Sequence, residues 1–323
     1  MQFTQIPQHY SPLGDALLYT VKHTAAADIE VRVIDPSDSS VLAAKRFASV
    51  AEASFDIAPA LRRGLRFEPR QGGTGFVDSA GRCATAQVKA FLSDDEAVVA
   101  TSSSRVFLPG DSPASSPSLL TTMPRERLIP EGACDELTIF SEAAFAVTVT
   151  AVGPDSTSAQ HYRSSNSGLQ PFRLDTRDFP GAETITVDAG VCGQVVYTLV
   201  PAREEAVRLA WRSHVGSIEH YSFPVVRETT LRVDKTRGYG ADGPVVTAWL
   251  SERETHLVSA YESTSVLEAL AGVIAAPEVW LVEEEGYTPV DITTDEATIL
   301  RHGAMCCLEI AFRSTRKTSA SWN

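Results

Sequence analysis

The sequence predicts a mainly β protein, with tandem β-sandwich-like domains followed by a C-terminal β-rich α+β domain that has one short helix. The chain has 323 residues, more than one ordinary hydrophobic core holds, so several domains are expected. Short segments rich in β-branched and aromatic residues recur between turn-forming residues, which is typical of sandwiches and barrels. A longer helical pattern is confined to residues 264–276.

Residues 1–108 are expected to form the first β-sandwich-like domain. Residues 29–34 alternate between apolar and polar side chains for most of their length, as a half-buried strand does. A turn at residues 35–40 leads to a return segment, which predicts a hairpin. A single helical turn is expected within residues 55–62. Further strands are predicted over residues 65–67, 84–92 and 97–107.

A stretch rich in Pro and Ser, residues 109–118, has almost nothing to bury and is expected to link the first two domains. The second domain, residues 119–202, is rich in predicted strands, which two sheets packed face to face would bury. Residues 155–168 are expected to form a polar loop. The strands predicted in this domain are residues 136–140, 144–152, 184–188 and 194–200.

The third domain, residues 203–313, is expected to combine a sheet with the helix at residues 264–276. Ser265 and Glu268 have the spacing of a capping box, and Pro277 ends the helical pattern. An exposed acidic hairpin tip is predicted at residues 283–286, and a loose polar tail over residues 314–323. The aromatic residues of this domain include Trp211 and a row that could form a stacking platform for sugars, although most of them are expected in the core: Tyr221, Phe223, Trp249, Tyr261 and Trp280.

Composition limits the classes of function. A net charge of −13 argues against a phosphate-neutralising surface, so no nucleic-acid partner is expected. The longest weakly polar run, residues 266–276, is too short to cross a bilayer, and the N-terminal residues lack the pattern of a signal peptide. The five scattered cysteines are expected to be unpaired and mostly buried, as in a reducing compartment.

Residues 238–243 match the letters of the dinucleotide-binding motif G-x-G-x-x-G. That motif needs a helix directly after it, whereas Pro244 and the residues after it are typical of a strand. The sequence instead predicts a long glycine-containing loop over residues 235–243, which is suited to contact a partner. The proposed contact residues are Arg237, Tyr239 and Asp242 in this loop and Tyr287 beside another.

No catalytic, metal-binding or cofactor-binding set emerges from the sequence, so neither enzymatic activity nor a cofactor is expected. His214 and His220 flank one hairpin and are interpreted as exposed histidines. Acidic residues could bind calcium or act as glycosidase carboxylates, although acidic loop residues are usually only solvated. They are Asp94, Asp95 and Glu96, and Asp291 with Asp295 and Glu296.

The last third of the chain resembles structural, tail-associated proteins encoded by phages and prophages of Bacteroidetes. Residues 211–223 are similar to a hairpin of those proteins with the order Trp, polar, Gly, then aromatic-x-Phe. Residues 257–262, 267–281 and 287–292 resemble other segments of the family, and the N-terminal hairpin resembles it more weakly. The resemblance implies a building block of a virion or tail and supplies no catalytic residues.

The leading hypothesis is therefore a non-enzymatic phage or prophage structural protein that acts through protein–protein assembly. Its expected partners are further copies of itself and other virion or tail proteins, in the host cytoplasm during assembly and then in the virion. The alternative is a bacterial cell-surface adhesin or carbohydrate-binding module, for which exposed aromatic residues and tandem β-sandwiches are suitable. A glycosidase or a metal-dependent hydrolase is a third, less supported hypothesis.

Overall fold

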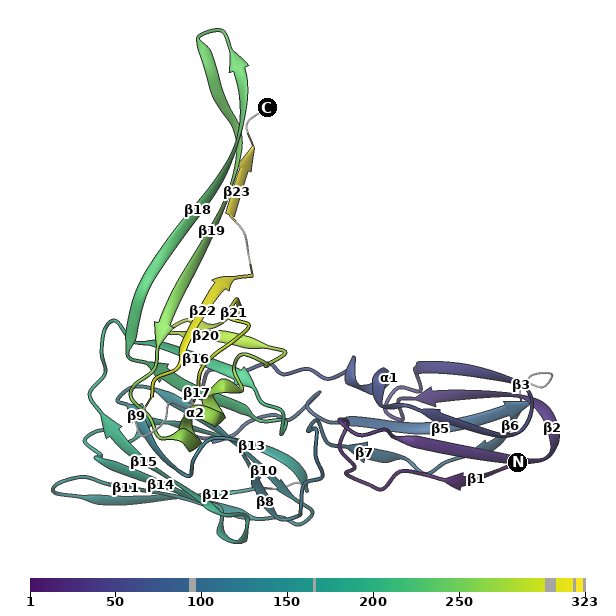
Figure 1. Ribbon diagram of the computed structural model, residues 1–323. Helices are drawn as coiled ribbons and strands as arrows, with labels where there is room; N and C mark the ends of the chain where they lie inside the picture. Colours follow the sequence, from purple (N-terminus) through teal and green to yellow (C-terminus); the bar gives the residue numbers. More distant parts are fainter. Residues whose placement is uncertain (93–96, 165–166, 300–305, 316–317, 322–323) are drawn as a thin grey trace.

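The computed structural model describes residues 1–92, 97–164, 167–299, 306–315 and 318–321. It is mainly β, with four sheets, two short α-helices and two single-turn 3-10 helices among the described residues. The sheets form three units, and a long hairpin projects from the third (Figure 1). The predicted class, a mainly β protein of several domains, is confirmed.

The first unit is a six-stranded sheet dominated by a long hairpin. Tyr19, Ile29 and Val88 are buried on its inner face, where the short helix α1 (Ala58–Arg62) covers them. This helix is the predicted helical turn, and Pro59 in its first turn is favourable because its missing N–H has no partner there. The strands are β1 (Gln2–Gln5), β2 (Leu18–Ile34), β3 (Val41–Asp56), β5 (Ala84–Leu92), β6 (Val98–Thr101) and β7 (Arg105–Phe107).

The second unit is a β-sandwich, as predicted. Alternate residues such as Leu137, Phe172, Val149 and Val187 point inward from both sheets and share one core. One sheet has the order β4 (Gly75–Phe76), β13 (Gly168–Asp175), β10 (Cys134–Ser141) and β8 (Ser118–Leu120). The other has the order β12 (Thr157–Arg163), β11 (Ala146–Val152), β14 (Thr184–Asp188), β15 (Gln194–Val200) and β9 (Glu126–Pro130). The 3-10 helices are Thr176–Asp178 and Gly190–Cys192.

The third unit is an eight-stranded sheet with helix α2 (Thr264–Ala271) on one face. Leu267 and Leu270 of this helix pack against Trp211 and Phe223, which are fully buried as expected. The strand order is β17 (Ile218–Phe223), β16 (Val207–Arg212), β20 (Val279–Glu283), β21 (Gly286–Ile292), β22 (Glu309–Ser314), β19 (Gly243–Val258) and β18 (Val225–Gly240). The eighth strand, β23 (Thr318–Ser321), pairs with β19.

Three predicted segments differ from the structure. The loop expected at residues 155–168 contains β12, which pairs along its whole length with β11. The tail expected to be loose contains β23, because β19 offers it a free edge. The helix is shorter than predicted, and its N-cap is Ser263, two residues before the expected Ser265. The hydroxyl oxygens of Ser263 and Ser265 lie 3.0 Å apart, so Ser265 forms a hydrogen bond with the N-cap side chain instead of being the cap itself.

The first predicted domain also extends beyond its own sheet. Strand β4 lies within residues 1–108 of the sequence, yet it pairs with β13 of the sandwich. Arg82 forms a buried ion pair with Glu136 of β10, and Phe67 packs on Trp280 of the third unit. The stretch between α1 and β5 therefore fastens the first unit to the other two.

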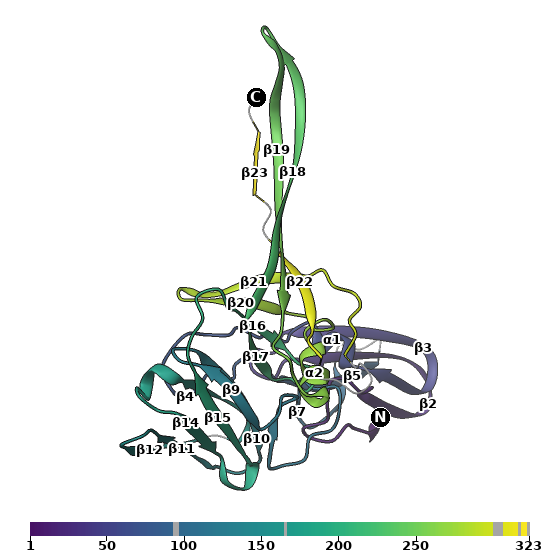
Figure 2. The same cartoon turned by 60° about the vertical axis from the view of Figure 1, so that its left-hand side comes forward.

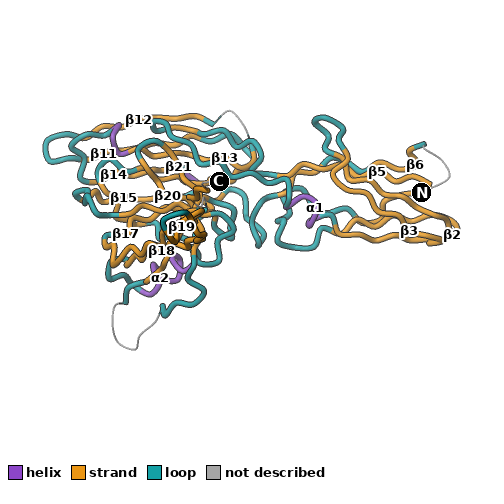
Figure 3. Tube along the Cα trace, turned by 90° about the horizontal axis from the view of Figure 1, so that it is seen from above, coloured by secondary structure: helices purple, strands orange, loops and turns teal. Residues whose placement is uncertain are grey.

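The three units form an angled body. In two side views the first unit extends to one side, and the β18–β19 hairpin stands above the rest (Figure 1, Figure 2). Seen along this hairpin, the first unit extends away from the other two (Figure 3). The predicted linker is packed, since Asp111 N–H donates to the His214 carbonyl across 2.8 Å. Among the described residues, no helix has the length and apolar character needed to span a membrane.

Candidate interaction surfaces

The most exposed feature of the molecule is the hairpin β18–β19, called the arm below. Its two strands are 16 residues each, and nearly all residues of β18 are exposed. The exposed fractions of the apolar side chains Leu231 and Val233 are 59% and 38%. Strand β23 pairs with residues 248–251 of β19, but such a narrow ribbon has no core of its own, so large apolar side chains on it are available to a partner.

The structure brings three of the four predicted contact residues together at the tip of the arm. Arg237 and Tyr239 lie on β18, and Asp242 lies in the turn between the strands. Tyr239 is 92% exposed. The loop predicted over residues 235–243 is wrong, because pairing continues to Gly240 opposite Gly243. The prediction that a strand follows this glycine segment is confirmed, since β19 begins at Gly243.

Tyr287, the fourth predicted contact residue, does not belong to this surface. It lies on β21, and its hydroxyl contacts Arg173 Nη1 at 3.2 Å and His220 Nε2 at 3.3 Å. Burial, together with the nearby Cys134 thiol, raises the pKa of Tyr287 above its ordinary value. Tyr287 is thus a half-buried contact between the sandwich and the third unit, and its expected role as an exposed residue is corrected.

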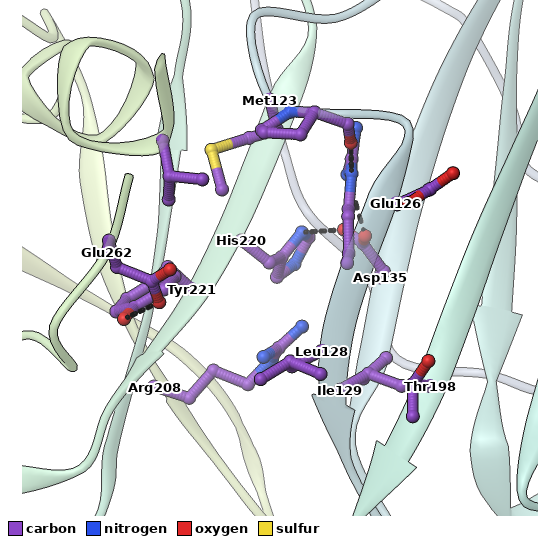
Figure 4. A pocket seen from close by; sticks show the side chains of 13 residues that line it. Met123, Glu126, Leu128, Ile129, Asp135, Thr198, Arg208, His220, Tyr221 and Glu262 are labelled. Atoms are coloured by element: carbon purple, nitrogen blue, oxygen red, sulfur yellow. Dashed lines mark hydrogen bonds and ion pairs between the residues drawn. The ribbon is translucent and has the colours of Figure 1, made fainter. Parts of the chain in front are cut away.

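A buried polar cluster joins the sandwich to the third unit around Asp135. The Oδ2 atom of Asp135 accepts hydrogen bonds from Arg127 Nη1 and Tyr197 Oη, both at 2.9 Å. The Nδ1 atom of His220 lies 3.1 Å from Oδ1 of the same carboxylate (Figure 4). His220 is buried, so the interpretation of this residue as an exposed hairpin histidine is wrong, whereas His214 is exposed.

The pKa shifts in this cluster follow from burial and from charge pairing. Burial alone would raise the pKa of Asp135, but Arg127 and His220 outweigh it and hold this pKa well below its usual range. Burial lowers the pKa of His220, and Asp135 opposes that effect only in part. Burial, and then the adjacent Asp135, raise the pKa of Tyr197. The cluster is therefore a carboxylate–guanidinium pair with neutral partners.

Glu219 extends the cluster. Its carboxylate accepts from the Thr122 backbone N–H at 2.9 Å and from the Ser217 hydroxyl at 2.7 Å. Its Oε2 atom accepts from the Thr121 hydroxyl at 3.0 Å and lies 3.7 Å from Arg127 Nη1. Arg127 is shared by the two carboxylates, and the carboxylate oxygens are bonded within the chain, so this cluster is organised to hold two units together.

A small cavity of about 260 Å³ lies beside the cluster, and a wider groove follows it. The cavity is lined by Asp135 and His220 on one side and by Tyr221 and Glu262 on the other (Figure 4). The groove has a volume of about 800 Å³ and a largely apolar lining that includes Leu128, Pro224, Val225 and Tyr261. Tyr261 is 71% exposed at its rim.

The other candidate chemical groups form no cluster among the residues that the structure describes. Asp94, Asp95 and Glu96 lie outside the described residues, and Asp291 pairs with Arg313 at 2.9 Å. Within the described part of the chain, no three His, Cys, Asp or Glu side chains are arranged to hold a metal ion. The five cysteines are free thiols, and Cys134, Cys192 and Cys306 are buried.

Sequence reasoning missed the Asp135 cluster because its members come from strands far apart in the chain. Asp135 occurs in a segment with the pattern of a strand, where an inward-pointing carboxylate requires a buried partner. Charged residues within strands at Arg127, Asp135 and Glu219 are the only available signal.

Comparison with known proteins gives no family. Neither the scan against protein-family models nor the search of curated proteins found a match. Solved structures with a partial likeness include Dpr2 Ig1-Ig2 in complex with DIP-Theta Ig1-Ig3, with 11% identity over 62% of this chain and 98% of that chain and a TM-score of 0.19. Another is the I9-I11 tandem from titin, with 10% identity over 99% of this chain and 94% of that chain and a TM-score of 0.16.

A third likeness is to the native conformation of E. coli alpha-2-macroglobulin, with 11% identity and a TM-score of 0.20. The match covers 78% of this chain but 21% of that one, so this chain spans about a fifth of its length. TM-scores this low assign neither a family nor a function. The mainly β, multidomain class rests on the strands and sheets described above.

Proposed function

We propose that this chain is a non-enzymatic structural protein that works through protein–protein assembly, with the arm as its assembly surface. The observation that carries the proposal is the arm itself, a ribbon whose two 16-residue strands leave the body and expose apolar side chains at Leu231, Val233 and Tyr239. Exposed strands are a common means of joining chains, because backbone groups supply the affinity and side chains the specificity.

At the finer level we propose a component of a phage or prophage tail, assembled in the host cytoplasm and retained in the virion. The resemblance to tail-associated proteins of Bacteroidetes phages supports this proposal, and it covers residues 211–223, 257–262, 267–281 and 287–292. Mass spectrometry of particles induced from the host strain tests it directly. Recovery of the chain at stoichiometric abundance is the expected result, and its absence from purified particles would contradict the phage role.

A cell-surface adhesin or carbohydrate-binding module is the second proposed function, because Tyr261 is exposed at the rim of the apolar groove. A glycan array on the full chain separates the two functions when Tyr261→Ala is compared with Tyr239→Ala. The assembly proposal predicts no reproducible glycan ligand. A ligand that Tyr261→Ala abolishes and Tyr239→Ala leaves intact would establish the second function instead.

A further inference from the structure

The outer edge of β18 is free along the arm. Strand β18 is the last in the order of its sheet, and β19 pairs with it on one side only. The opposite edge of β19 is covered by β22 and β23, whereas the described part of the chain places nothing on the outer edge of β18. Native proteins usually protect a long free edge, because its unpaired backbone groups recruit another strand.

We propose that this edge pairs, in antiparallel orientation, with the same edge of a second copy of the chain, and that Val233 lies opposite Val233 on the two-fold axis. The inference rests on the proposed function and names the partner of the arm. The pairing would join the β18–β19 hairpins of two copies, with β23 on the far edge of each, into one continuous sheet. It is an isologous contact, in which both copies use the same residues.

Symmetry restricts the register of such a pair. Side chains opposite each other on antiparallel strands point to the same face of the sheet. A two-fold axis that relates two antiparallel strands is perpendicular to the sheet, so each side chain keeps its face in the second copy. The axis must then lie midway between the two copies of one residue, which face each other. Registers in which the axis falls between two successive residues are excluded.

Charge selects among the remaining registers. With Val233 on the axis, Arg232 lies opposite Asp234 of the second copy, and this attractive pair occurs twice. An axis at Arg232 or at Asp234 would place two like charges opposite each other. An axis at Leu231 would place Glu228 opposite Asp234, which is also repulsive.

Two rival registers remain: one centred on Thr230, which places Glu228 opposite Arg232, and one centred on Thr229, which places no like charges opposite each other. The length of the regular part of β18 decides among these registers, and it leaves an axis at Thr229 only residues 228–230. Its pairing with β19 is uninterrupted from Glu228 to Thr236, with irregularities on both sides. Within that stretch an axis at Val233 uses residues 230–236, whereas an axis at Thr230 uses only residues 228–232. The longer ladder forms more hydrogen bonds, so Val233 is favoured.

The register with Val233 on the axis also covers the apolar side chains of β18. Leu231 and Val233 point to one face, because they alternate with Arg232. Across the axis Val233 meets its own copy, and Leu231 lies opposite Lys235 of the second copy. The aliphatic part of a lysine side chain can cover a neighbouring apolar side chain while its charge stays in water.

Cysteine cross-linking of the full chain tests the register. Residues opposite each other across an antiparallel pair have Cα atoms about 4.5–5.5 Å apart, within the range of a disulfide. Val233→Cys, Thr230→Cys and Leu231→Cys are each oxidised mildly, with the natural chain as the control for its own five cysteines. We expect a reducible dimer from Val233→Cys at a yield about tenfold above the other two, because only that residue meets itself.

Three outcomes would overturn this inference. A dominant Thr230→Cys dimer would replace the register with the rival centred on that residue. If none of the variants cross-links although light scattering shows that the natural chain self-associates, pairing of the two arms is wrong while the proposed function stands. A chain that remains monomeric at every concentration would contradict both.

Charge reversal supplies a second, independent readout. Asp234→Lys would put two positive charges opposite each other on both sides of the axis, so we expect it to weaken self-association about tenfold. Asp242→Lys makes the same change of charge in the turn, outside the paired stretch, and should leave self-association within about twofold. An equal loss from both variants would contradict the register, because general repulsion would then account for it.

Discussion

The Nδ1 atom of His220 on β17 lies 3.1 Å from Oδ1 of Asp135 on β10, and this contact ties the third unit to the sandwich. Both side chains are buried, and Arg127 already neutralises the carboxylate. Because burial disfavours a charged imidazole, His220 holds its position as a neutral ring. The junction between the two units is therefore sensitive to protonation.

Stability should fall as the pH drops through the range of a free histidine. The folded-state pKa of His220 is lowered, so the unfolded chain binds more protons below about pH 6.5, and the free energy of unfolding decreases with acidification there. His220→Gln removes this linked proton. Urea unfolding between about pH 5 and pH 8 should give a flatter pH dependence for the variant than for the natural chain.

The matched control is His214→Gln, which changes an exposed histidine in the turn of the same hairpin. We expect this variant to keep the pH dependence of the natural chain. The account of the junction fails if His214→Gln flattens the profile while His220→Gln leaves it unchanged.

Loss of the Asp135 carboxylate should destabilise the protein strongly. Asp135→Ala removes the carboxylate that hydrogen-bonds the buried Arg127 guanidinium and leaves it only Glu219 at 3.7 Å. Breaking a buried pair of this kind costs about 3–5 kcal/mol. Asp155→Ala, at an exposed position of the same unit, should change the free energy of unfolding by less than about 0.5 kcal/mol. Chemical denaturation measures both, and equal losses would show that the cluster does not hold the units together.

The ion pair between Arg82 and Glu136 should fix the orientation of the first unit. Two guanidinium nitrogens of Arg82 bond the two carboxylate oxygens, and both side chains are buried between the units. In Arg82→Met this clamp is lost, and small-angle X-ray scattering should detect a broader distribution of molecular dimensions. The exposed Arg63→Met is the control, and a distribution as broad as that of Arg82→Met would refute the clamp.

Close packing at Gly216 should keep the linker against the third unit. Gly216 has φ of +81°, and a Cβ there would lie 2.4 Å from Pro109 Cγ. Gly132 has φ of +77° with open space around it. Both Ala variants carry the backbone cost of about 1–2 kcal/mol, but Gly216→Ala adds a clash of about 1–3 kcal/mol.

Thermal and urea unfolding measure the stability of the two variants. Because both carry a similar backbone cost, the difference in stability between them reports the clash with Pro109. We expect Gly216→Ala to be clearly the less stable of the pair. Equal stability would mean that Pro109 can move away, and that the linker is not held in place by the third unit.

The predictable part of this fold came from local patterns. Alternation in residues 29–34 and apolar spacing in residues 264–276 depend only on neighbouring side chains, so strands and a helix could be placed there. The glycines at 238, 240 and 243 indicated a loop, yet they lie in and beside paired strands near a solvent-exposed tip. Glycine is tolerated at this exposed end of the hairpin, because no side chain is needed there to pack against a core.

The candidate surfaces could be predicted only in part. Arg237, Tyr239 and Asp242 were identified because local turn signals surround them. Asp135 and His220 are 85 positions apart in the sequence, and only the docking of the third unit on the sandwich brings them together. The same docking buries the hydroxyl of Tyr287, which had the sequence pattern of an exposed loop residue.

The most direct test of arm-mediated assembly is sedimentation velocity over a wide range of concentrations, with the full chain and an arm-trimmed variant. Arg232 and Glu252 lie opposite each other, so residues 233–251 can be replaced by Asn-Gly, a favoured two-residue hairpin turn. We predict that the full chain self-associates as its concentration rises, and that the trimmed chain stays a folded monomer. A full chain that remains monomeric throughout, or a trimmed chain that associates equally well, would contradict the account.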